Sequence, residues 1–376
     1  MIDENIESID FSKDYDLVAL SAITQQAMRA YKIADEFKAK GVKVVMGGIH
    51  PTMLPKEAKK HCDTVIVGEA EESWPQFIKD FLKNKIQSFY YSSSPANLES
   101  SPLPRYDLLK PGNYKVIWMQ ATRGCPYDCE FCVASRVFGT KFRHKSIKQV
   151  IREIKLVKTI FKNCFIGFGD DNMFIDKRYA LELVEKLIPL KIKWVAQTDI
   201  SIAEDSKLLA LLKKGGCHML FIGFESLSDK SLMSINKMGF KLKRLHKYET
   251  YVKKIHSFGI GIVGAFILGF DSDDVSAFKK TADFIIDNHL YPQITILTPL
   301  PGTRLRARLE QENRLLSFDW DNYTFWDANF MPRQISIDEL QKGLLGIYRA
   351  VYNKKVLLEN DRYFKRIYSI QIKDNE

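Results

Sequence analysis

Hydrophobic positions along the chain follow two periods, and their alternation predicts a parallel α/β architecture. Short apolar runs bounded by Gly, Asp or Ser indicate buried strands, whereas longer stretches with apolar residues every three or four positions indicate amphipathic helices. Strands that alternate with helices favour parallel pairing, because each helix carries the chain back to the start of the sheet. The first series consists of strands at 16–21, 42–47 and 64–67 and helices at 25–40 and 73–82.

A second and longer series begins at Lys115. A full (β/α)8 barrel would need two more units than this series supplies. We therefore predict a partial, TIM-like (β/α)6 barrel, in which chemistry gathers at the carboxyl ends of the strands. Its six strands are expected at 116–121, 165–170, 194–198, 219–224, 261–266 and 293–297, with intervening helices such as 146–160, 177–187 and 276–287.

These patterns divide the chain into four parts. The first α/β series occupies 1–87, and a Ser- and Pro-rich stretch without periodicity at 88–114 is the predicted linker. The partial barrel spans 115–302. An aromatic-rich extension follows at 303–376, with a predicted helix at 337–352, and we expect it to cap the barrel mouth.

Composition narrows the class of protein. The net charge of +10 is spread as Lys-rich helix faces, which we interpret as solvated surface, so no nucleic-acid partner is expected. The first residues are acidic and do not resemble a signal peptide, and the apolar stretch 258–270 is too short to span a bilayer. Of the six cysteines, Cys62, Cys164 and Cys217 are scattered and are predicted to be buried hydrophobes, which fits a reducing, cytoplasmic location.

The other three cysteines, Cys125, Cys129 and Cys132, lie close together after the first barrel strand. Three thiolates at such spacing can hold three irons of a 4Fe–4S cluster, leaving the fourth iron open to a small chelating molecule. A zinc site usually needs four ligands in two pairs, and the nearest downstream histidine, His144, has no second partner at zinc-finger spacing. An odd number of cysteines also argues against a disulfide. The cluster is the favoured interpretation.

This CxxxCxxC spacing, with Phe131 before the last cysteine, resembles the signature of radical S-adenosylmethionine (SAM) enzymes. The resemblance implies that SAM chelates the open iron and is cleaved reductively to methionine and a 5′-deoxyadenosyl radical. It also implies the open six-unit barrel that the hydrophobic pattern predicts.

Further site residues follow from the resemblance at the strand ends. Asp170, in a Gly-Asp-Asp-Asn turn, would hold the amino group of SAM, and the choice between it and Asp171 stays open. Glu225 would lie near the ribose or the methionine. Three more positions complete the predicted cofactor contacts: Gln197 lining the cavity, Gly264 allowing close approach of the adenine, and the Phe131 backbone facing the adenine edge.

The first α/β segment resembles the cobalamin-binding domain that precedes many radical SAM methylases. The matching stretches are 20–24, 46–52 with Gly47 and Gly48, and 67–73. Glycines after strands suit close packing against a macrocycle or a phosphate. Compared with the family, the segment is expected to be an incomplete Rossmann-like domain that lacks its first strand and helix. Cobalamin binding is therefore left open.

The chain as a whole resembles the subgroup that includes hopanoid methylases and related C-methyltransferases. Our first hypothesis is a cobalamin-type radical SAM methyltransferase acting on an unactivated carbon of a small-molecule or lipid-like substrate. An electron donor such as flavodoxin or ferredoxin is expected. One alternative is a cobalamin-independent radical SAM enzyme that performs a rearrangement, oxidation or methylthiolation, and another is a non-catalytic iron–sulfur sensor.

Overall fold

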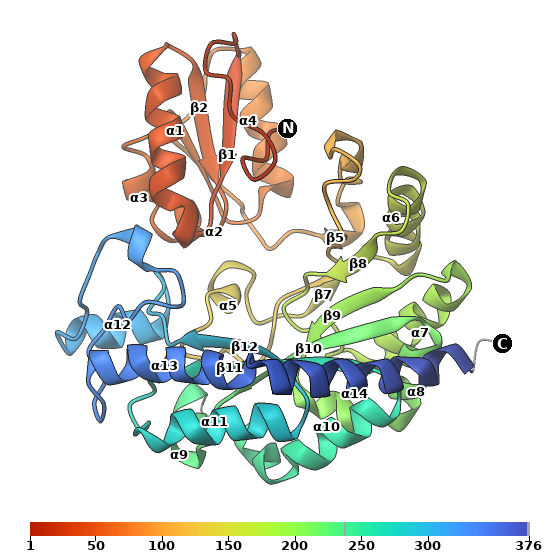
Figure 1. Cartoon of the computed structure of the whole chain (residues 1–376). Coiled ribbons are helices and arrows are strands. Elements are labelled where there is room, and N and C mark those ends of the chain that lie inside the picture. The colour runs from red at the N-terminus through yellow and green to blue at the C-terminus, as the bar shows by residue number, and fades with distance from the viewer. Residues whose placement is uncertain (237, 374–376) are drawn as a thin grey trace.

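The computed structural model describes residues 1–236 and 238–373, and within them two parallel sheets lie one above the other. Figure 1 shows the smaller sheet in red and orange at the top and the larger one, yellow to blue, below it. No helix among the described residues has both the length and the apolar character needed to cross a membrane.

The smaller sheet has the order β1-β2-β3-β4, and all of its strands are parallel. The three predicted strands are confirmed, and β4 is an addition inside the predicted linker, where its short sequence among Ser and Pro residues gave no periodicity. The strands are β1 (Leu17–Ser21), β2 (Lys43–Gly47), β3 (Thr64–Val67) and β4 (Phe89–Tyr91); the helices are α1 (Ala27–Ala39), α2 (Ile49–Met53), α3 (Pro55–Ala58) and α4 (Ala70–Leu82).

The larger sheet has six parallel strands in the order β12-β11-β10-β9-β8-β5 and remains open between its two edge strands, which confirms the predicted partial barrel. Helices cover its outer face (Figure 1). The strands are β5 (Val116–Met119), β8 (Phe165–Phe168), β9 (Trp194–Thr198), β10 (Cys217–Glu225), β11 (Gly261–Leu268) and β12 (Tyr291–Ile296). The helices are α6 (Ile147–Ile160), α7 (Lys177–Leu187), α8 (Ser206–Lys214), α9 (Asp229–Ile235), α10 (Tyr248–Ser257) and α11 (Ser276–Asp287).

Alternate strand residues form the core between the sheet and these helices. Ile117, Phe168 and Ile222 are almost fully buried there, together with Ile154 of α6 and Leu183 of α7. This alternation follows from the two-residue period of a strand, which sends successive side chains to opposite faces.

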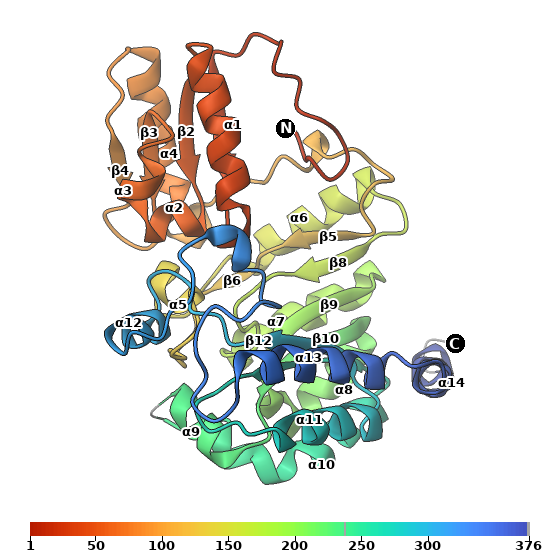
Figure 2. The same cartoon turned by 60° about the vertical axis from the view of Figure 1, so that its left-hand side comes forward.

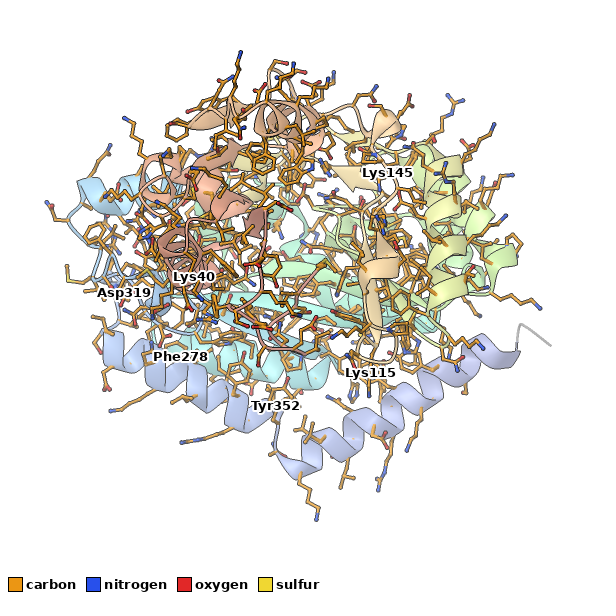
Figure 3. All side chains as sticks on the ribbon, turned by 90° about the horizontal axis from the view of Figure 1, so that it is seen from above. Lys40, Lys115, Lys145, Phe278, Asp319 and Tyr352 are labelled. Atoms are coloured by element: carbon orange, nitrogen blue, oxygen red, sulfur yellow. The ribbon has the colours of Figure 1, made fainter. Side chains whose placement is uncertain are left out.

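The helical C-terminal region is confirmed, but the predicted cap over the barrel mouth is wrong for its two long helices. α13 (Ile337–Val351) packs alongside α11, and α14 (Lys354–Lys373) covers the amino ends of strands β10 and β12. Seen from above, the two helices run along one side of the molecule and meet near Tyr352 (Figure 3). The stacked pairs at α14 are His218–Tyr368, Tyr291–Phe364 and His289–Tyr363, with ring centroids 4.0, 4.1 and 3.8 Å apart.

The segment before α13 does reach the upper sheet (Figure 2). Trp320 and Tyr323 are buried in one core with Ala27 and Tyr31 of α1. The Trp320 indole donates to Glu57 over 2.7 Å, and Glu57 also accepts from the Tyr31 hydroxyl over 3.0 Å. The extension thus completes the core of the first α/β unit and joins it to the barrel.

Candidate active site

The three-cysteine loop leaves the barrel through the short strand β6 (Thr122–Arg123), which pairs with β7 (Arg143–His144). Gly124 begins the loop with a φ of 89°, and a Cβ at this position would lie only 2.3 Å from the Lys141 carbonyl oxygen. Only glycine fits here, because a side chain would require both a strained backbone and displacement of the facing chain.

Ion pairs and backbone bonds hold the loop from several sides. Asp128, with a φ of 44°, pairs with Arg136 and Arg304, while Arg308 pairs with Glu130 at 2.7 Å. The Glu130 backbone N–H donates to the Ile235 carbonyl over 2.8 Å. The Glu130 backbone carbonyl accepts the Leu305 N–H. Segments distant in the sequence therefore fix the loop in one conformation.

The thiols of Cys125, Cys129 and Cys132 are half-buried and lie near one another. Burial raises the pKa of Cys125 to about 11 and that of Cys129 to about 12, and it also raises the pKa of Cys132; neighbouring thiols add to the effect in Cys125 and Cys129. Metal binding at such a site would release protons, because the ligand is the thiolate.

Three thiols on one loop are a donor set that a cluster can use. Across residues 1–236 and 238–373, no three His, Cys, Asp or Glu side chains stand close enough to share one metal ion. In a 4Fe–4S cluster each cysteine binds a different iron, so the three sulfurs need to surround a common space and not converge on one point. The donor set, three thiols on one loop, fits a cluster.

Asp170 occupies a different environment from the one we predicted. Its side chain is fully buried, and its carboxylate accepts backbone N–H groups from Ala121 (3.2 Å) and Thr122. Burial raises the pKa of Asp170 to about 7, although these hydrogen bonds act in the opposite direction. The residue therefore ties β8 to the end of β5, and its oxygens are already used.

The neighbouring Asp171 faces the cysteine loop. It accepts the Gly124 N–H over 2.9 Å, and it is near enough to Cys125 and Cys132 to affect the pKa of both thiols. Burial raises the pKa of Asp171, while the Gly124 N–H and nearby guanidinium groups lower it. Of the two aspartates in the turn, Asp171 is the one whose carboxylate lies beside the cysteine loop.

Glu225 ends β10 in the left-handed backbone region, with a φ of 67°. Its carboxylate lies over Gly223, where a Cβ would be 2.2 Å from the Glu225 Oε1 atom. Lys241 donates to the same oxygen over 2.7 Å and is nearly fully buried. Burial alone would lower the pKa of Lys241, but the Glu225 carboxylate raises it above its usual range. Lys241 also lies near Cys129, so the pair adjoins the cysteine loop.

The remaining predicted SAM contacts are divided between two faces of the barrel. Gln197 is exposed on the inner side and reaches the Asp171 carbonyl at 3.5 Å. The ring of Phe131 packs edge-on near Phe270, with centroids 6.5 Å apart. Gly264 faces the outer helices, since a Cβ there would lie 2.9 Å from Leu290. Its missing side chain serves core packing.

The predicted cobalamin glycines lie at the carboxyl edge of the smaller sheet. Gly48 has a φ of 95°, and a Cβ would lie 2.8 Å from the Ala22 backbone, so the glycine allows two strand ends to approach. At Gly47 a Cβ would make ordinary contacts. Gly68, with a φ of 87°, has open space where its side chain would be, and this is where a bound group could approach the backbone. Of these three glycines, Gly68 is the one that leaves room for a flat macrocycle at that edge, and Gly48 serves the close approach of the two strand ends.

Glu69, within the Gly-Glu-Ala-Glu stretch, connects the two sheets. It is buried and accepts hydrogen bonds from Arg123 (2.7 Å) and Arg143 (2.9 Å) and from the Ala96 N–H (2.8 Å). Arg123 immediately precedes the cysteine loop. The carboxyl edge of the upper sheet is thereby held opposite the cysteine loop. We refer to Glu69, Arg123 and Arg143 as the interdomain clamp.

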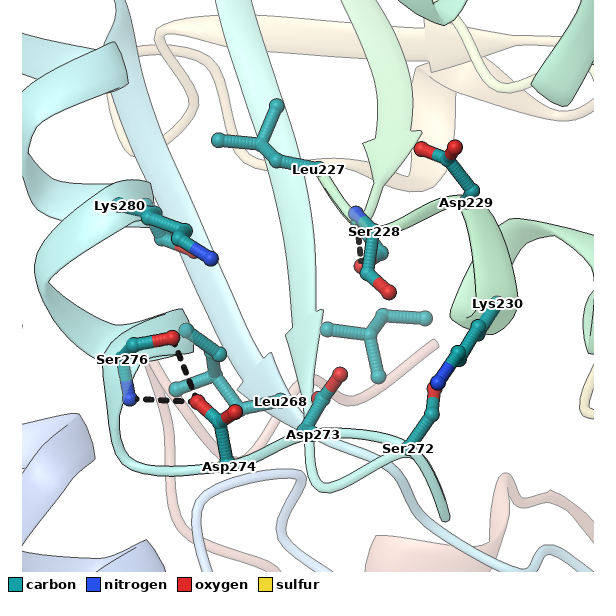
Figure 4. Close-up of a pocket in the computed structure, with 14 residues that line it drawn as sticks. Leu227, Ser228, Asp229, Lys230, Leu268, Ser272, Asp273, Asp274, Ser276 and Lys280 are labelled. Atoms are coloured by element: carbon teal, nitrogen blue, oxygen red, sulfur yellow. Dashed lines mark hydrogen bonds between the residues drawn. The ribbon is translucent and has the colours of Figure 1, made fainter.

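A separate cavity of about 340 Å3 lies between the loops that follow β10 and β11 (Figure 4). Its walls carry hydroxyl groups and charges of both signs, including Ser228, Asp273 and Lys280. Asp273 accepts the N–H groups of Gly269 and Phe270 at 3.0 Å and so fixes the loop after β11. The predicted site residues do not line this cavity.

Sequence reasoning missed Lys241 and the clamp role of Glu69. Lys241 stands in a Lys-rich stretch that resembles solvated surface, and its partner is 16 residues away across a helix and a loop. Nothing in the local pattern distinguishes it from the exposed lysines around it. Glu69 belonged to a recognised stretch, but its partners lie in another domain.

Comparisons with known proteins agree with this arrangement. The model of the radical SAM superfamily matches residues 119–285, that of the B12-binding domain matches 3–78, and a domain of unknown function (DUF4070) matches 303–375. The bacteriochlorophyllide d C-12(1)-methyltransferase of Chlorobaculum tepidum is 35% identical over 358 residues, covering 93% of this chain and 77% of that protein. The hopanoid C-2 methylase of Rhodopseudomonas palustris is 26% identical over 333 residues, covering 85% and 62%.

Among solved structures, the radical SAM methyltransferase TsrM from Kitasatospora setae, with cobalamin and a [4Fe-4S] cluster bound, has a similar fold. The TM-score is 0.65 at 14% sequence identity, over 80% of this chain and 68% of that one. At this identity the likeness concerns the fold alone.

Proposed function

The chain belongs to the radical SAM superfamily, in the branch that carries a B12-binding domain and includes methyltransferases, and we propose how its own residues support methyl transfer to an unactivated carbon. The observation that carries the proposal is the position of three half-buried thiols on one loop, which the interdomain clamp holds opposite the carboxyl edge of the B12-type sheet.

Cys125, Cys129 and Cys132 would hold the 4Fe–4S cluster. When bound, the cluster supplies the electron that cleaves SAM, and cobalamin carries the methyl group to be transferred. The protein contributes position and exclusion of water. The ion pairs of Asp128 and Glu130 would hold the cysteine loop, and with it the three sulfurs, in one conformation before the cofactors bind.

Asp171 and Glu225 would orient SAM. Asp171 presents a carboxylate beside the thiols, where it can accept hydrogen bonds from an ammonium group. Glu225 has one oxygen paired with Lys241, which fixes the side chain and leaves the other oxygen for a ribose or amino group. Gln197 and the Phe131 backbone complete the predicted surroundings. Gly264 is left out of the proposal, because the space beside it is filled by the core side chains of Leu290, Phe266 and Phe224.

Cobalamin would occupy the carboxyl edge of the smaller sheet, at Gly47, Gly48 and Gly68. His50, in the same Gly-Gly stretch, is fully buried and bonded to Tyr31 at 3.0 Å and to Thr24 at 3.3 Å. This histidine is therefore part of the domain core and would not serve as a ligand to cobalt. A small-molecule substrate and a low-potential electron donor such as flavodoxin or ferredoxin complete the proposal.

The test is anaerobic reconstitution with iron, sulfide and methylcobalamin, followed by SAM and dithionite. We expect release of 5′-deoxyadenosine, and corrin absorbance that stays with the protein after gel filtration. The Cys129→Ser variant should lose the cluster and the product. Cys164→Ser, which alters a cysteine outside the loop, is the matched control and should retain both.

Two outcomes would contradict the proposal in different ways. A verified cluster that yields no 5′-deoxyadenosine would overturn the radical reaction. Production of 5′-deoxyadenosine by protein that retains no corrin would favour the cobalamin-independent alternative.

A further inference from the structure

Trp118 is an exposed tryptophan in the middle of a barrel strand. It is 61% exposed, while its neighbours on β5, Ile117 and Met119, are 2% and 5% exposed in the core with the outer helices. Since successive strand residues face opposite sides, Trp118 projects from the inner face of the barrel sheet. Leaving most of an indole in water forgoes much of the apolar burial that an aromatic side chain can supply.

The inner face of the neighbouring strand is shaped to receive the indole. Trp118 stands opposite Gly167 in the β5–β8 register. A Cβ at Gly167 would lie 2.5 to 2.8 Å from three atoms of the six-membered indole ring, and one at Gly169 would lie 3.7 Å from the ring. The two glycines thus let the ring rest against the backbone of β8. Any side chain at Gly167 would push it away.

The position of Trp118 is also fixed along the chain. Asp170 binds the N–H groups of Ala121 and Thr122, and this ties the end of β5 to the end of β8. The strand continues directly through Arg123 into the cysteine loop. On β9, Val195 stands opposite Gly167. Gln197, the following residue on the same face, is exposed and gives the surface a polar edge.

We propose that Trp118, supported by Gly167 and Gly169, is a stacking platform for a planar, conjugated polycyclic substrate of the tetrapyrrole class. An exposed indole face held rigidly on a sheet favours a flat π-system, because stacking adds to the burial of apolar area. This inference rests on the proposed function, which requires that a substrate binds in the barrel. The tetrapyrrole class is supported by the similar bacteriochlorophyllide d C-12(1)-methyltransferase of Chlorobaculum tepidum.

The test measures binding and does not require turnover. Zinc protoporphyrin IX is titrated with the reconstituted protein, and its emission anisotropy gives the dissociation constant. We expect Trp118→Ala to weaken binding about 10-fold, with Trp118→Phe within about 3-fold of the parent, because phenylalanine keeps an aromatic face. Trp326→Ala is the matched control, since Trp326 is 48% exposed on the C-terminal extension, and it should bind as the parent does.

The possible outcomes separate this inference from the proposed function. Equal binding by the parent and Trp118→Ala, or no binding by a folded parent, would overturn the platform. The release of 5′-deoxyadenosine without substrate is measured for the parent and for Trp118→Ala. If both release it equally, the radical chemistry is intact, and weaker porphyrin binding by the variant is caused by the loss of the Trp118 indole. A Gly167→Val variant gives a second check, because it should displace the indole and weaken binding although Trp118 is still present.

Discussion

Two adjacent aspartates at the end of β8 have different environments because the chain turns between them. Asp170 points into the sheet and satisfies two backbone donors, while Asp171 points to the cysteine loop and satisfies one. A carboxylate whose oxygens are occupied by backbone N–H groups stabilises the fold, whereas one with free acceptor capacity beside a cofactor site can bind a ligand.

This difference predicts opposite phenotypes for the two amide variants. Asp171→Asn should weaken SAM binding at least 10-fold with the iron content unchanged, because it removes the charge that faces an ammonium group. Asp170→Asn should lower the free energy of unfolding by about 1–3 kcal/mol, because its amide keeps one acceptor oxygen but turns an N–H donor towards the Ala121 N–H, which contacts both carboxylate oxygens in the parent. Equilibrium dialysis of SAM and urea unfolding, both anaerobic, distinguish the two. Reversed phenotypes would return the SAM contact to Asp170.

The site could be predicted from sequence only where its residues are close in the chain. The cysteine spacing is local, so a single stretch of sequence is enough to predict the three cysteines as cluster ligands. The choice between Asp170 and Asp171 depends on which backbone N–H groups each carboxylate meets in the folded chain. The Lys241–Glu225 pair and the exposure of Trp118 depend on which strands become neighbours. A tryptophan in an apolar strand normally indicates core, and the pattern around Trp118 contains no contrary signal.

At the level of elements, hydrophobic periodicity predicted the strands closely. β3 and β9 have the predicted bounds, as do helices α7 and α11, because each has apolar residues on one face and a polar boundary at both ends. Helix α13 is also found at its predicted position. Periodicity does not specify which surface a helix covers, and this explains the incorrect placement of the extension. α14 follows α13 after a short break and was not predicted as a helix.

The contact between α10 and α14 predicts a pH-dependent stability. His256 of α10 is 3% exposed and bonds to the Tyr363 hydroxyl at 3.0 Å, with His289 nearby. Burial, aided by His289, lowers the pKa of His256 to about 4. A histidine buried in its neutral form stabilises the fold fully above its unfolded pKa of about 6.5, and this contribution is lost as the pH falls towards 4. Between pH 7.5 and 5 we expect a loss of about 2 kcal/mol.

Urea unfolding at a series of pH values checks this expectation. His256→Phe should flatten the curve between pH 7.5 and 5. Tyr363→Phe keeps the histidine buried and removes only its hydrogen-bond partner, so the loss of stability at low pH should persist. An unchanged slope in His256→Phe would assign the effect to other groups.

In the whole molecule, Glu69, Arg123 and Arg143 hold the carboxyl edge of the smaller sheet opposite the cysteine loop of the barrel. The predicted family, partial barrel and enzyme class are confirmed by the family models and by the methyltransferase of Chlorobaculum tepidum. Neither periodicity nor motif spacing could predict how the two sheets are joined, because the contacts between them come from single residues such as Glu69 and Trp320. Under the proposed function, methyl transfer would depend on this junction, since an error of about 1 Å in position can cost 100-fold in rate.

The interdomain clamp therefore predicts uncoupling of the two half-reactions. Glu69→Ala leaves Arg123 and Arg143 without their shared buried carboxylate, and breaking such a buried pair is strongly destabilising for the contact it supports. The upper sheet should shift relative to the cysteine loop, while the ion pairs of Asp128 and Glu130 still hold the loop itself. We expect release of 5′-deoxyadenosine within about 3-fold of the parent and at least a 10-fold lower yield of methylated product.

The ratio of 5′-deoxyadenosine to methylated product measures this uncoupling, and limited proteolysis of the 88–114 segment reports on the junction independently of activity. Glu71→Ala is the matched control, because Glu71 pairs with Arg123 at 2.6 Å but its side chain is 19% exposed, against 4% for Glu69. Solvent can replace the more exposed carboxylate, so the control should change the ratio less. If Glu69→Ala reduced both products equally, the clamp would act on the cysteine loop and not on the placement of the upper sheet.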